Sequence, residues 1–190
     1  MAKAVLISIR PEWVEKILSG EKTLELKKTR PKLETPFKCY IYCTNQKNIM
    51  LWNARSYIYV DDHNHNAFDR CWNGSVVGEF VCDRIDTINP ETEPHGIYDV
   101  DDDFVVQTRL VDGALWDYGK GATLYGWHIS KLKIYDTPKE LPQFRKCCGT
   151  QDCDKCQFWE NTGEYAGCLT SEERRLNRAP QSWCYVEELK

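Results

Sequence analysis

The first thirty residues constrain the fold most, because strand and helix patterns follow one another there within a short stretch. Residues 4–10, AVLISIR, are an apolar run of the length expected for a buried strand. Pro11 suits the first turn of a helix. The apolar residues after it repeat at helical spacing: Trp13, Val14, Ile17 and Leu18. Gly20 suits the end of that helix, and residues 23–29, TLELKKT, begin with the alternation of a strand.

The second strand of this unit carries its charges on one face. In a strand, Leu24 and Leu26 point to one side of the sheet, and Glu25 and Lys27 point to the other. The pattern predicts a half-buried strand, and we interpret residues 20–27, GEKTLELK, as the edge of a binding cleft. The alternative is a solvated strand face with an ordinary surface ion pair.

Four further segments have strand patterns, and they are spread over the rest of the chain. They are residues 37–44, 75–88, 123–135 and 181–189. Gly78 indicates a bulge in the second of these segments. The third segment is typical of a bent strand or a pair of strands.

The segments between these strands have weaker patterns. Residues 45–73 are polar with scattered aromatic residues and suggest an insertion, residues 89–104 an acidic loop, and residues 114–118 one helical turn. Residues 146–170 hold half of the ten cysteines and suggest a second insertion. Several short strands around one helix favour an α+β fold, a small and partly open β-barrel with one or two flanking helices. We expect a single domain over residues 1–190.

Composition favours a protein of the cytoplasm. The apolar run within residues 1–10 is too short for a signal peptide. No stretch approaches the ~18 apolar residues that a membrane span needs. Ten cysteines without a secretory signal argue for reduced thiols or a metal site rather than a disulfide scaffold. We therefore expect a cytoplasmic chain with no membrane segment.

Charge is unevenly distributed along the chain. The formal net charge is −4, yet residues 1–48 contain ten lysines and arginines against five glutamates. A basic N-terminal part can meet phosphate groups, whereas the acidic remainder repels a long nucleic-acid duplex. This distribution favours a local pocket or groove. A chance excess of surface lysines is the alternative.

Five cysteines near the C-terminal end have the pattern C-C-x4-C-x2-C-x11-C. The two residues between Cys153 and Cys156 let both thiolates reach one ion. Cys148 and Cys168 complete a four-thiolate site, with Cys147 as the alternate ligand. We predict a structural zinc ion in a knuckle-like insertion, with unligated thiols or an iron–sulfur cluster as alternatives. Such a closed site would stabilise the fold of the insertion rather than act in catalysis.

The charged strand face suggests recognition of a nucleobase. A carboxylate such as Glu25 binds an amide or exocyclic amine edge, and the flanking Lys22 and Lys27 can hold phosphate or carbonyl oxygens. Ser8 and Arg10 are two positions apart on the preceding strand, so they share a face and can point toward the same site. A lysine acts as a base or nucleophile only when burial or a neighbouring cation lowers its pKa.

Tryptophan is the other residue type that a base pocket needs, because base stacking contributes about 1–3 kcal/mol per base. Trp52, Trp127 and Trp183 are candidates, and Trp127 is the best of them because His128 follows it. A place in the core is the alternative for each, since tryptophan is highly buried on average.

Residues 20–27 resemble the hallmark of the ASCH domain family, a branch of the PUA-like superfamily. The hallmark is G-x-K-x-x-E-x-R between the first helix and the second strand. Gly20, Lys22 and Glu25 match it, and Lys27 stands where arginine is usual. Lysine is a point charge without the planar fork of arginine.

Later segments extend the resemblance. Residues 76–88, which include Gly78 and Glu79, resemble the central strand of the family. The motifs WHIS at 127–130 and APQSW at 179–183 are similar to those of ASCH proteins from phages and prophages of Gram-positive bacteria.

The resemblance implies a PUA-like β-barrel whose cleft takes RNA, a nucleotide or a modified base. Taken together, the residue patterns and the resemblance predict a ligand-binding set of Ser8, Arg10, Lys22, Glu25, Lys27, Glu79 and Trp127. Some small ASCH proteins hydrolyse the amide of N4-acetylcytidine with a lysine, a threonine and a glutamate. Lys22 fits their lysine, whereas Glu25 occupies the threonine position.

Three functions follow as hypotheses. The first is a binding module for RNA or a modified nucleotide. The second is an amidohydrolase for an N-acylated nucleobase, with Lys22 and Glu25 as catalytic residues. The third is a phage or prophage factor that binds a host protein through residues 45–73 and the cysteine-rich insertion.

Overall fold

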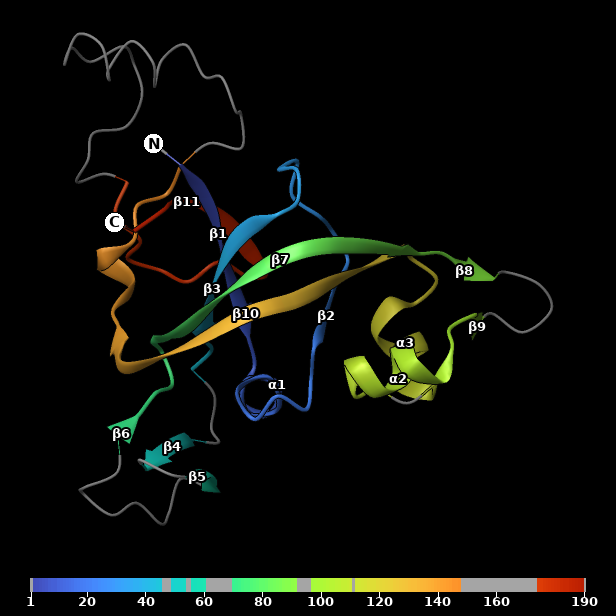
Figure 1. The fold of residues 1–190 in the computed structure, drawn as a ribbon, viewed down its shortest axis with the longest axis horizontal. Coiled ribbons are helices and arrows are strands. Elements are labelled where there is room, and N and C mark those ends of the chain that lie inside the picture. The colour runs from blue at the N-terminus through green and yellow to red at the C-terminus, as the bar shows by residue number, and fades with distance from the viewer. Residues whose placement is uncertain are drawn as a thin grey trace, which may run out of the picture.

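The computed structural model describes residues 2–45, 49–53, 56–60, 70–91, 97–110, 112–147 and 174–189. Six strands form its main sheet (Figure 1). In spatial order they are β11 (Trp183–Glu187), β1 (Lys3–Ile9), β3 (Phe37–Cys43), β7 (Val76–Ile88), β10 (Leu124–Lys139) and β2 (Leu24–Lys27). Each lies within a segment that has a strand pattern in the sequence or overlaps most of one, so these strand predictions are confirmed.

The first strand–helix–strand unit is present as expected. β1 leads into α1 (Pro11–Leu18), with Pro11 at the first helical position. Gly20 follows the helix in the left-handed region with φ of 80°, a conformation that favours glycine. β1 pairs in parallel with β3, and the other neighbouring strands of the sheet pair antiparallel.

β7 and β10 form a long bent ribbon through the middle of the sheet. Gly78 of β7 lies beside the predicted bulge, because the register to β3 shifts there. A Cβ atom on Gly78 would be 2.6 Å from the backbone oxygen of Lys133 in β10. Glycine is therefore required for the close approach of the two strands. The register between β7 and β10 shifts at three places, which confirms the bent-strand interpretation of residues 123–135.

Two helices that the sequence patterns did not predict in full pack beside β2 and β10. They are α2 (Asp102–Thr108) and α3 (Asp112–Gly119). The prediction of one or two flanking helices is therefore wrong, since the described residues contain three α-helices and a 3-10 turn, η1 (Leu141–Gln143). The predicted loop at 89–104 is also wrong in part, because it contains the short pair β8 (Pro90–Glu91) and β9 (Ile97–Tyr98) and the start of α2.

The sheet is open in its hydrogen bonding. β11 and β2 are its two edges, and no ladder joins them among the described residues. Side chains span the seam instead: Trp183 Nε1 donates to Thr29 Oγ1 at 2.9 Å, and the backbone N–H of Lys32 donates to the Tyr185 hydroxyl at 2.7 Å. The expected barrel is thus a six-stranded sheet that side-chain contacts bring together at its edges.

The two faces of the sheet have separate apolar cores, as strand alternation requires. The first surrounds Trp127, Phe80 and Ile7, and the second surrounds Tyr40, Phe144 and Leu6. A third cluster joins β2 and β10 to α2 and α3.

The structure describes only parts of the two predicted insertions. Within 45–73, β4 (Ile49–Asn53), β5 (Ser56–Val60) and β6 (Arg70–Cys71) form a three-stranded sheet. Of the cysteine-rich segment, only the beginning lies within the described residues. Across the part of the chain that the structure covers, no helix has the length and apolar character needed to cross a membrane.

Candidate functional site

Lys22, Glu25 and Lys27 form one buried charge cluster. Their exposed fractions are 3%, 6% and 7%. Glu25 Oε2 lies 3.5 Å from Lys22 Nζ, and Glu25 Oε1 lies 3.1 Å from Lys27 Nζ. One carboxylate is therefore shared by two ammonium groups. The alternative of a solvated strand face is wrong, because all four residues of β2 are buried.

Strand alternation and the helices beside β2 explain this burial. Leu26 packs with Leu115 and Leu124 in the cluster that α2 and α3 cover. Glu25 and Lys27 point to the other face of β2, where their cross-strand neighbours are Trp127 and Tyr125. Covering both faces of this edge strand leaves its charged side chains inside the molecule.

Backbone carbonyls hold the two ammonium groups. Lys22 Nζ donates to the carbonyl oxygen of Thr108 at 2.7 Å, and Lys27 Nζ donates to that of Ser8 at 3.0 Å. Thr108 is the last residue of α2, so Lys22 satisfies a carbonyl at the negative end of this helix. An ammonium group has three N–H donors. Among the described residues, a carbonyl oxygen and a carboxylate oxygen account for two of these donors on each lysine.

The end of α2 is fixed on the segment before β2 by further contacts. The backbone N–H of Thr23 donates to the Gln107 carbonyl at 3.1 Å, and Arg109 Nε donates to the Glu21 carbonyl at 3.0 Å. The position of Lys22 therefore depends on α2 as well as on its own strand.

Burial changes the acidity of groups in and beside the cluster. It lowers the pKa of Lys22, and the neighbouring Glu25 carboxylate opposes the shift. Burial also raises the pKa of Tyr118 to about 12, and the negative charge of Glu25 adds to this effect. The Tyr118 hydroxyl donates to the Leu26 carbonyl at 3.1 Å.

Two aromatic residues of the site were missed as site residues in the sequence. The Lys22 ammonium lies 5.2 Å from the centre of the Trp13 ring, within range of a cation–π contact. Tyr118 lies in α3 and is 37% exposed, so its ring borders solvent. Trp13 was identifiable as part of the helix pattern, but no spacing in the sequence connects Tyr118 with a strand ninety residues earlier.

Trp127 is enclosed beside the cluster. The side chain has no exposed surface, and its ring meets those of Phe37 and Trp183 at centroid distances of 5.8 and 5.9 Å. Its indole N–H has no hydrogen-bond partner within the described part of the chain. A buried donor without a partner is uncommon, and a bound ligand is one way of satisfying it.

The structure does not bring every predicted site residue to the cluster. The Ser8 hydroxyl donates to the Pro180 carbonyl at 2.7 Å, so Ser8 contributes only its backbone oxygen. The Arg10 side chain is 68% exposed and lies 3.9 Å from Glu12.

Glu79 lies apart from the cluster. It is the cross-strand partner of Tyr40 in the second core, on the other face of the sheet from Trp127. Its carboxylate accepts a hydrogen bond of 2.5 Å from the Tyr135 hydroxyl and lies 3.8 Å from Lys38 Nζ.

The predicted metal ligands Cys148, Cys153, Cys156 and Cys168 lie outside the described residues, as does the larger part of their insertion. The alternate ligand Cys147 is described, and its backbone N–H donates to the Tyr185 carbonyl at 3.0 Å. No group of three or more potential ligands occurs among the residues whose positions are described.

Comparison with known proteins gives a match by fold. No protein-family model and no curated protein matches the chain. The crystal structure of ASCH from Zymomonas mobilis matches with a TM-score of 0.52 and 15% identity, covering 97% of this chain and 88% of that one.

Two variants of the Zymomonas mobilis protein match similarly. A Tyr-to-Phe mutant has a TM-score of 0.50 and 16% identity over 98% of this chain and 92% of its own. A Ser-to-Ala mutant has a TM-score of 0.51 and 15% identity over 97% and 89%. The mixed α+β architecture is therefore shared with a structurally characterised ASCH protein.

Proposed function

We propose that the cluster of Lys22, Glu25 and Lys27 recognises the base of a nucleotide, either free or within single-stranded RNA. The observation that carries the proposal is one buried carboxylate shared by two buried ammonium groups. Three charges are costly to remove from water unless a further partner or function compensates. The cluster also has an excess of one positive charge, which an electron-rich ligand edge would offset.

The chemistry of the remaining donors and acceptors matches a base edge. Each lysine retains one N–H donor for a carbonyl or ring nitrogen, and Glu25 can accept from an exocyclic amine. Trp127 is the cross-strand neighbour of Glu25, and its indole N–H is a further donor that lacks a partner among the described residues. Because the Trp127 ring is fully enclosed, it supports recognition through its N–H or by completing the wall of the site rather than through an exposed stacking surface.

Burial of the cluster favours a single unstacked base over a duplex. Bases in single-stranded RNA can be splayed out into such a site, whereas a duplex keeps its Watson–Crick edges paired. The resemblance of residues 20–27 to the ASCH hallmark supports the same ligand class.

Calorimetric titration with nucleosides, nucleotides and short single-stranded RNAs tests the proposal. Lys22→Met should weaken the binding of any ligand that the wild type binds by about tenfold or more, as loss of a charge-assisted hydrogen bond implies. Lys32→Met removes the same charge from an exposed position and serves as the control. Absence of binding by the wild type, or equal binding by both variants, contradicts the proposal.

Amide hydrolysis on an N-acylated nucleobase is the second candidate function. The lowered pKa of Lys22 favours it, because a neutral amine can act as a base. In this reaction water adds to the acyl carbon as Lys22 takes its proton. The C–N bond then breaks, and the exocyclic nitrogen leaves with that proton, giving a carboxylic acid and the free amine. Glu25 would hold the Lys22 ammonium formed in between.

Incubation with N4-acetylcytidine distinguishes the two functions. The enzyme would release cytidine and acetate, and Lys22→Met would abolish this release while Lys32→Met would retain it. Binding of the nucleoside without release of cytidine would support a binding module and reject the hydrolase.

A further inference from the structure

A base that binds at the charge cluster would be stabilised by stacking on an aromatic ring. Trp127 does not offer its ring for this, because the side chain has no exposed surface. Among the described residues, four large hydrophobic side chains are exposed, namely Ile97, Val106, Trp116 and Tyr118. Of these four, Tyr118 is the one with a hydrogen bond to β2, which makes it the candidate for a stacking surface.

The hydroxyl end of Tyr118 reaches the neighbourhood of Glu25. The hydroxyl donates to the carbonyl oxygen of Leu26 at 3.1 Å, and Leu26 follows Glu25 in β2. Burial raises the pKa of Tyr118 to about 12, the negative charge of Glu25 adds to this rise, and the positive charge of Arg10 opposes it. The carboxylate therefore lies close enough to the hydroxyl for its charge to act on it.

The backbone that carries Tyr118 is firmly packed. Leu115 lies one turn earlier in α3 and is 2% exposed in the apolar cluster that joins this helix to β2 and β10. Gly119 follows Tyr118, and a Cβ atom on Gly119 would lie 1.9 Å from the Tyr98 hydroxyl, so α3 fits closely here. Because its backbone is packed and its hydroxyl is bonded, the ring is already ordered. An ordered ring loses little conformational entropy when a base stacks on it.

The ring of Tyr118 is also accessible. The residue is 37% exposed, whereas every residue of β2 is buried. The Lys28 ammonium lies 5.4 Å from the ring centre, and Lys28 is an exposed residue. One neighbour of the ring is thus a long, flexible side chain at the surface, which a planar base can displace.

We propose that Tyr118 is the residue on which the base of the bound nucleotide stacks while Glu25 binds the edge of that base. The stacking contact rests on the proposed function of the charge cluster and adds the aromatic partner that a base gains from there. Every nucleobase has a π face, so Tyr118 would select for a base without choosing among bases. Hydrogen bonds from the base edge to Glu25 and the two lysines would make that choice.

Calorimetric titration of the full chain with the four nucleoside 5′-monophosphates tests the stacking role, with ribose 5-phosphate as the ligand that has no base. Tyr118→Leu should weaken the binding of a nucleotide by about tenfold or more, because the stacking contribution of the base is lost. Tyr118→Phe should bind within about twofold of the wild type, because phenylalanine offers the same stacking face. Ribose 5-phosphate should bind the wild type about tenfold or more weakly than the nucleotide does.

Trp116→Leu is the matched control. It removes an aromatic side chain of the same helix with nearly the same exposed fraction, 36%. The Trp116 ring lies 5.8 Å from that of Tyr98, on β9 rather than β2. Nucleotide affinity should therefore be unchanged in this variant. Equal affinities of Tyr118→Leu and Tyr118→Phe, or equal losses in Tyr118→Leu and Trp116→Leu, overturn the stacking role.

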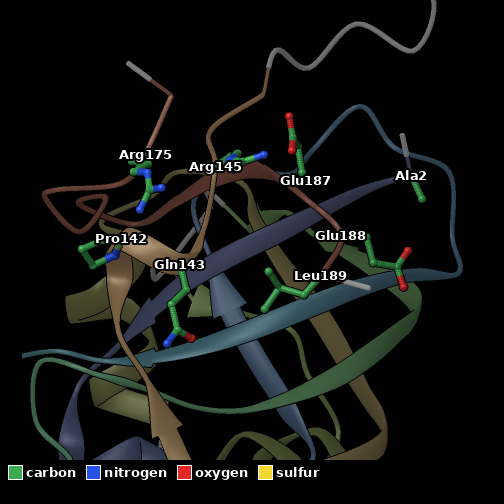
Figure 2. Close-up of a pocket in the computed structure, with 8 residues that line it drawn as sticks. All are labelled: Ala2, Pro142, Gln143, Arg145, Arg175, Glu187, Glu188 and Leu189. Carbon is green, nitrogen blue, oxygen red and sulfur yellow. The ribbon is translucent and has the colours of Figure 1, made fainter. Parts of the chain in front are cut away.

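A pocket elsewhere in the chain serves as a second control (Figure 2). Its volume of about 680 Å³ is sufficient for a small ligand, and none of the residues that line it belongs to β2 or α3. Arg145→Gln alters this pocket and should leave nucleotide affinity unchanged. Loss of binding in Arg145→Gln with full binding in Tyr118→Leu would place the nucleotide in this pocket and overturn the stacking role.

The variants also distinguish a failure of the stacking role from a failure of the proposed function. Weaker binding by Lys22→Met with unchanged binding by Tyr118→Leu would keep the function and overturn the stacking role. Equal binding by Lys22→Met and Lys32→Met, with weaker binding by Tyr118→Leu, would keep the stacking contact and contradict the function. Absence of nucleotide binding by the wild type contradicts both.

A measurement on the wild type covers the case in which Tyr118→Leu does not fold. In nuclear magnetic resonance spectra of the nucleotide complex, nuclear Overhauser effects should connect the ring protons of Tyr118 with the protons of the base. Such effects between the base and Trp116, with none to Tyr118, would overturn the stacking role.

Discussion

Glu25 is the residue on which the charge cluster depends. Its carboxylate lies between two ammonium groups that have little contact with water, and each oxygen faces a different lysine. Breaking a buried ion pair by removing one partner leaves an uncompensated charge, which is far more damaging than losing a surface pair. The stability of the chain should therefore respond strongly to this side chain.

The first prediction concerns Glu25→Gln. Loss of the negative charge leaves two buried cations together and should lower the free energy of unfolding by about 3–5 kcal/mol. Chemical denaturation measures this change. Glu21→Gln is the control, since Glu21 is half-exposed in its pairs with Lys16 and Arg109 and its loss should cost no more than about 1 kcal/mol. Equal losses in the two variants would contradict the account of the cluster.

The second prediction concerns the pH dependence that Lys22 contributes. Its pKa in the folded chain lies below the ordinary value of 10.5, so the unfolded chain binds more protons between the two values. Stability must then rise with pH in that interval. The difference in free energy of unfolding between the wild type and Lys22→Met should shift in favour of the wild type as pH is raised from neutral toward 10.5. A difference that stays flat or falls over this range rejects the lowered pKa.

At the scale of single residues, the sequence indicates which charged side chains lie together better than it indicates which other groups they contact. The spacing of Lys22, Glu25 and Lys27 on a strand was sufficient to group them. Their burial was not predictable from it, because the helices that cover β2 lie about eighty residues later. The carbonyl of Thr108 that binds Lys22 has no side-chain signature at all.

At the scale of elements, the close approach of β7 and β10 and the docking of α2 set the geometry around the site. Both depend on particular residues, namely Gly78 and Asp101. Asp101 caps α2, because its Oδ1 accepts a hydrogen bond of 2.7 Å from the Phe104 N–H.

The third prediction is that Gly78→Ala destabilises the fold by about 1–3 kcal/mol, the usual cost of overpacking. The added methyl group would meet the backbone oxygen of Lys133 at 2.6 Å, and a strand backbone cannot turn aside as a flexible side chain can. Thermal and chemical unfolding measure the loss. Gly113→Ala in α3 is the matched control, because open space surrounds that position and alanine favours helix. A Gly78→Ala variant as stable as the control would contradict the close approach.

The fourth prediction links α2 to the proposed ligand site. Asp101→Ala should lower the free energy of unfolding by about 1 kcal/mol, because the helix cap is lost. It should also lower the affinity for any ligand that binds through Lys22, since Thr108 at the other end of α2 positions this lysine. Asp101→Asn keeps an acceptor and should behave as the wild type. The free energy of unfolding and the ligand affinity are both measured. Weakened stability with unchanged affinity would show that α2 does not position Lys22.

Element prediction succeeded where a periodic apolar pattern was long enough and failed where capping was the main signal. The core strands and α1 have clear patterns, whereas residues 89–104 were interpreted as a loop because of their prolines and acidic character. Three consecutive aspartates from Asp101 to Asp103 in fact form the cap and first turn of α2, where acidic residues are favourable. β8 and β9 have two residues each, too few for any period to show.

At the scale of the whole molecule, the fold is shared with an ASCH protein although identity is only 15–16%. The strand–helix–strand pattern at the N-terminal end was enough to indicate the fold class. The side-chain contacts between the two edges of the open sheet were not predictable, because contacts such as that between Trp183 and Thr29 join residues 154 positions apart.

The fifth prediction concerns metal content and rests on the sequence alone. If Cys148, Cys153, Cys156 and Cys168 form a four-thiolate site, elemental analysis of the purified chain should find about one equivalent of zinc. Cys153→Ser together with Cys156→Ser should remove the metal, and Cys39→Ser is the control, because the Cys39 thiol is buried and burial raises its pKa. Iron in place of zinc would indicate a cluster, and less than about half an equivalent of either metal would reject the site.

Enclosure of the charge cluster also has a kinetic consequence. A ligand that touches Glu25 must wait until the surrounding side chains move aside, because the carboxylate offers almost no surface to a diffusing molecule. The association rate constant should then lie below the range of about 10⁵–10⁷ M⁻¹ s⁻¹ that is typical when only the orientation of the two molecules limits their encounter. As ligand concentration rises, the observed rate should level off at the rate of opening. The time a ligand spends bound would be governed by the same motion, so a modest affinity would not imply a short-lived complex.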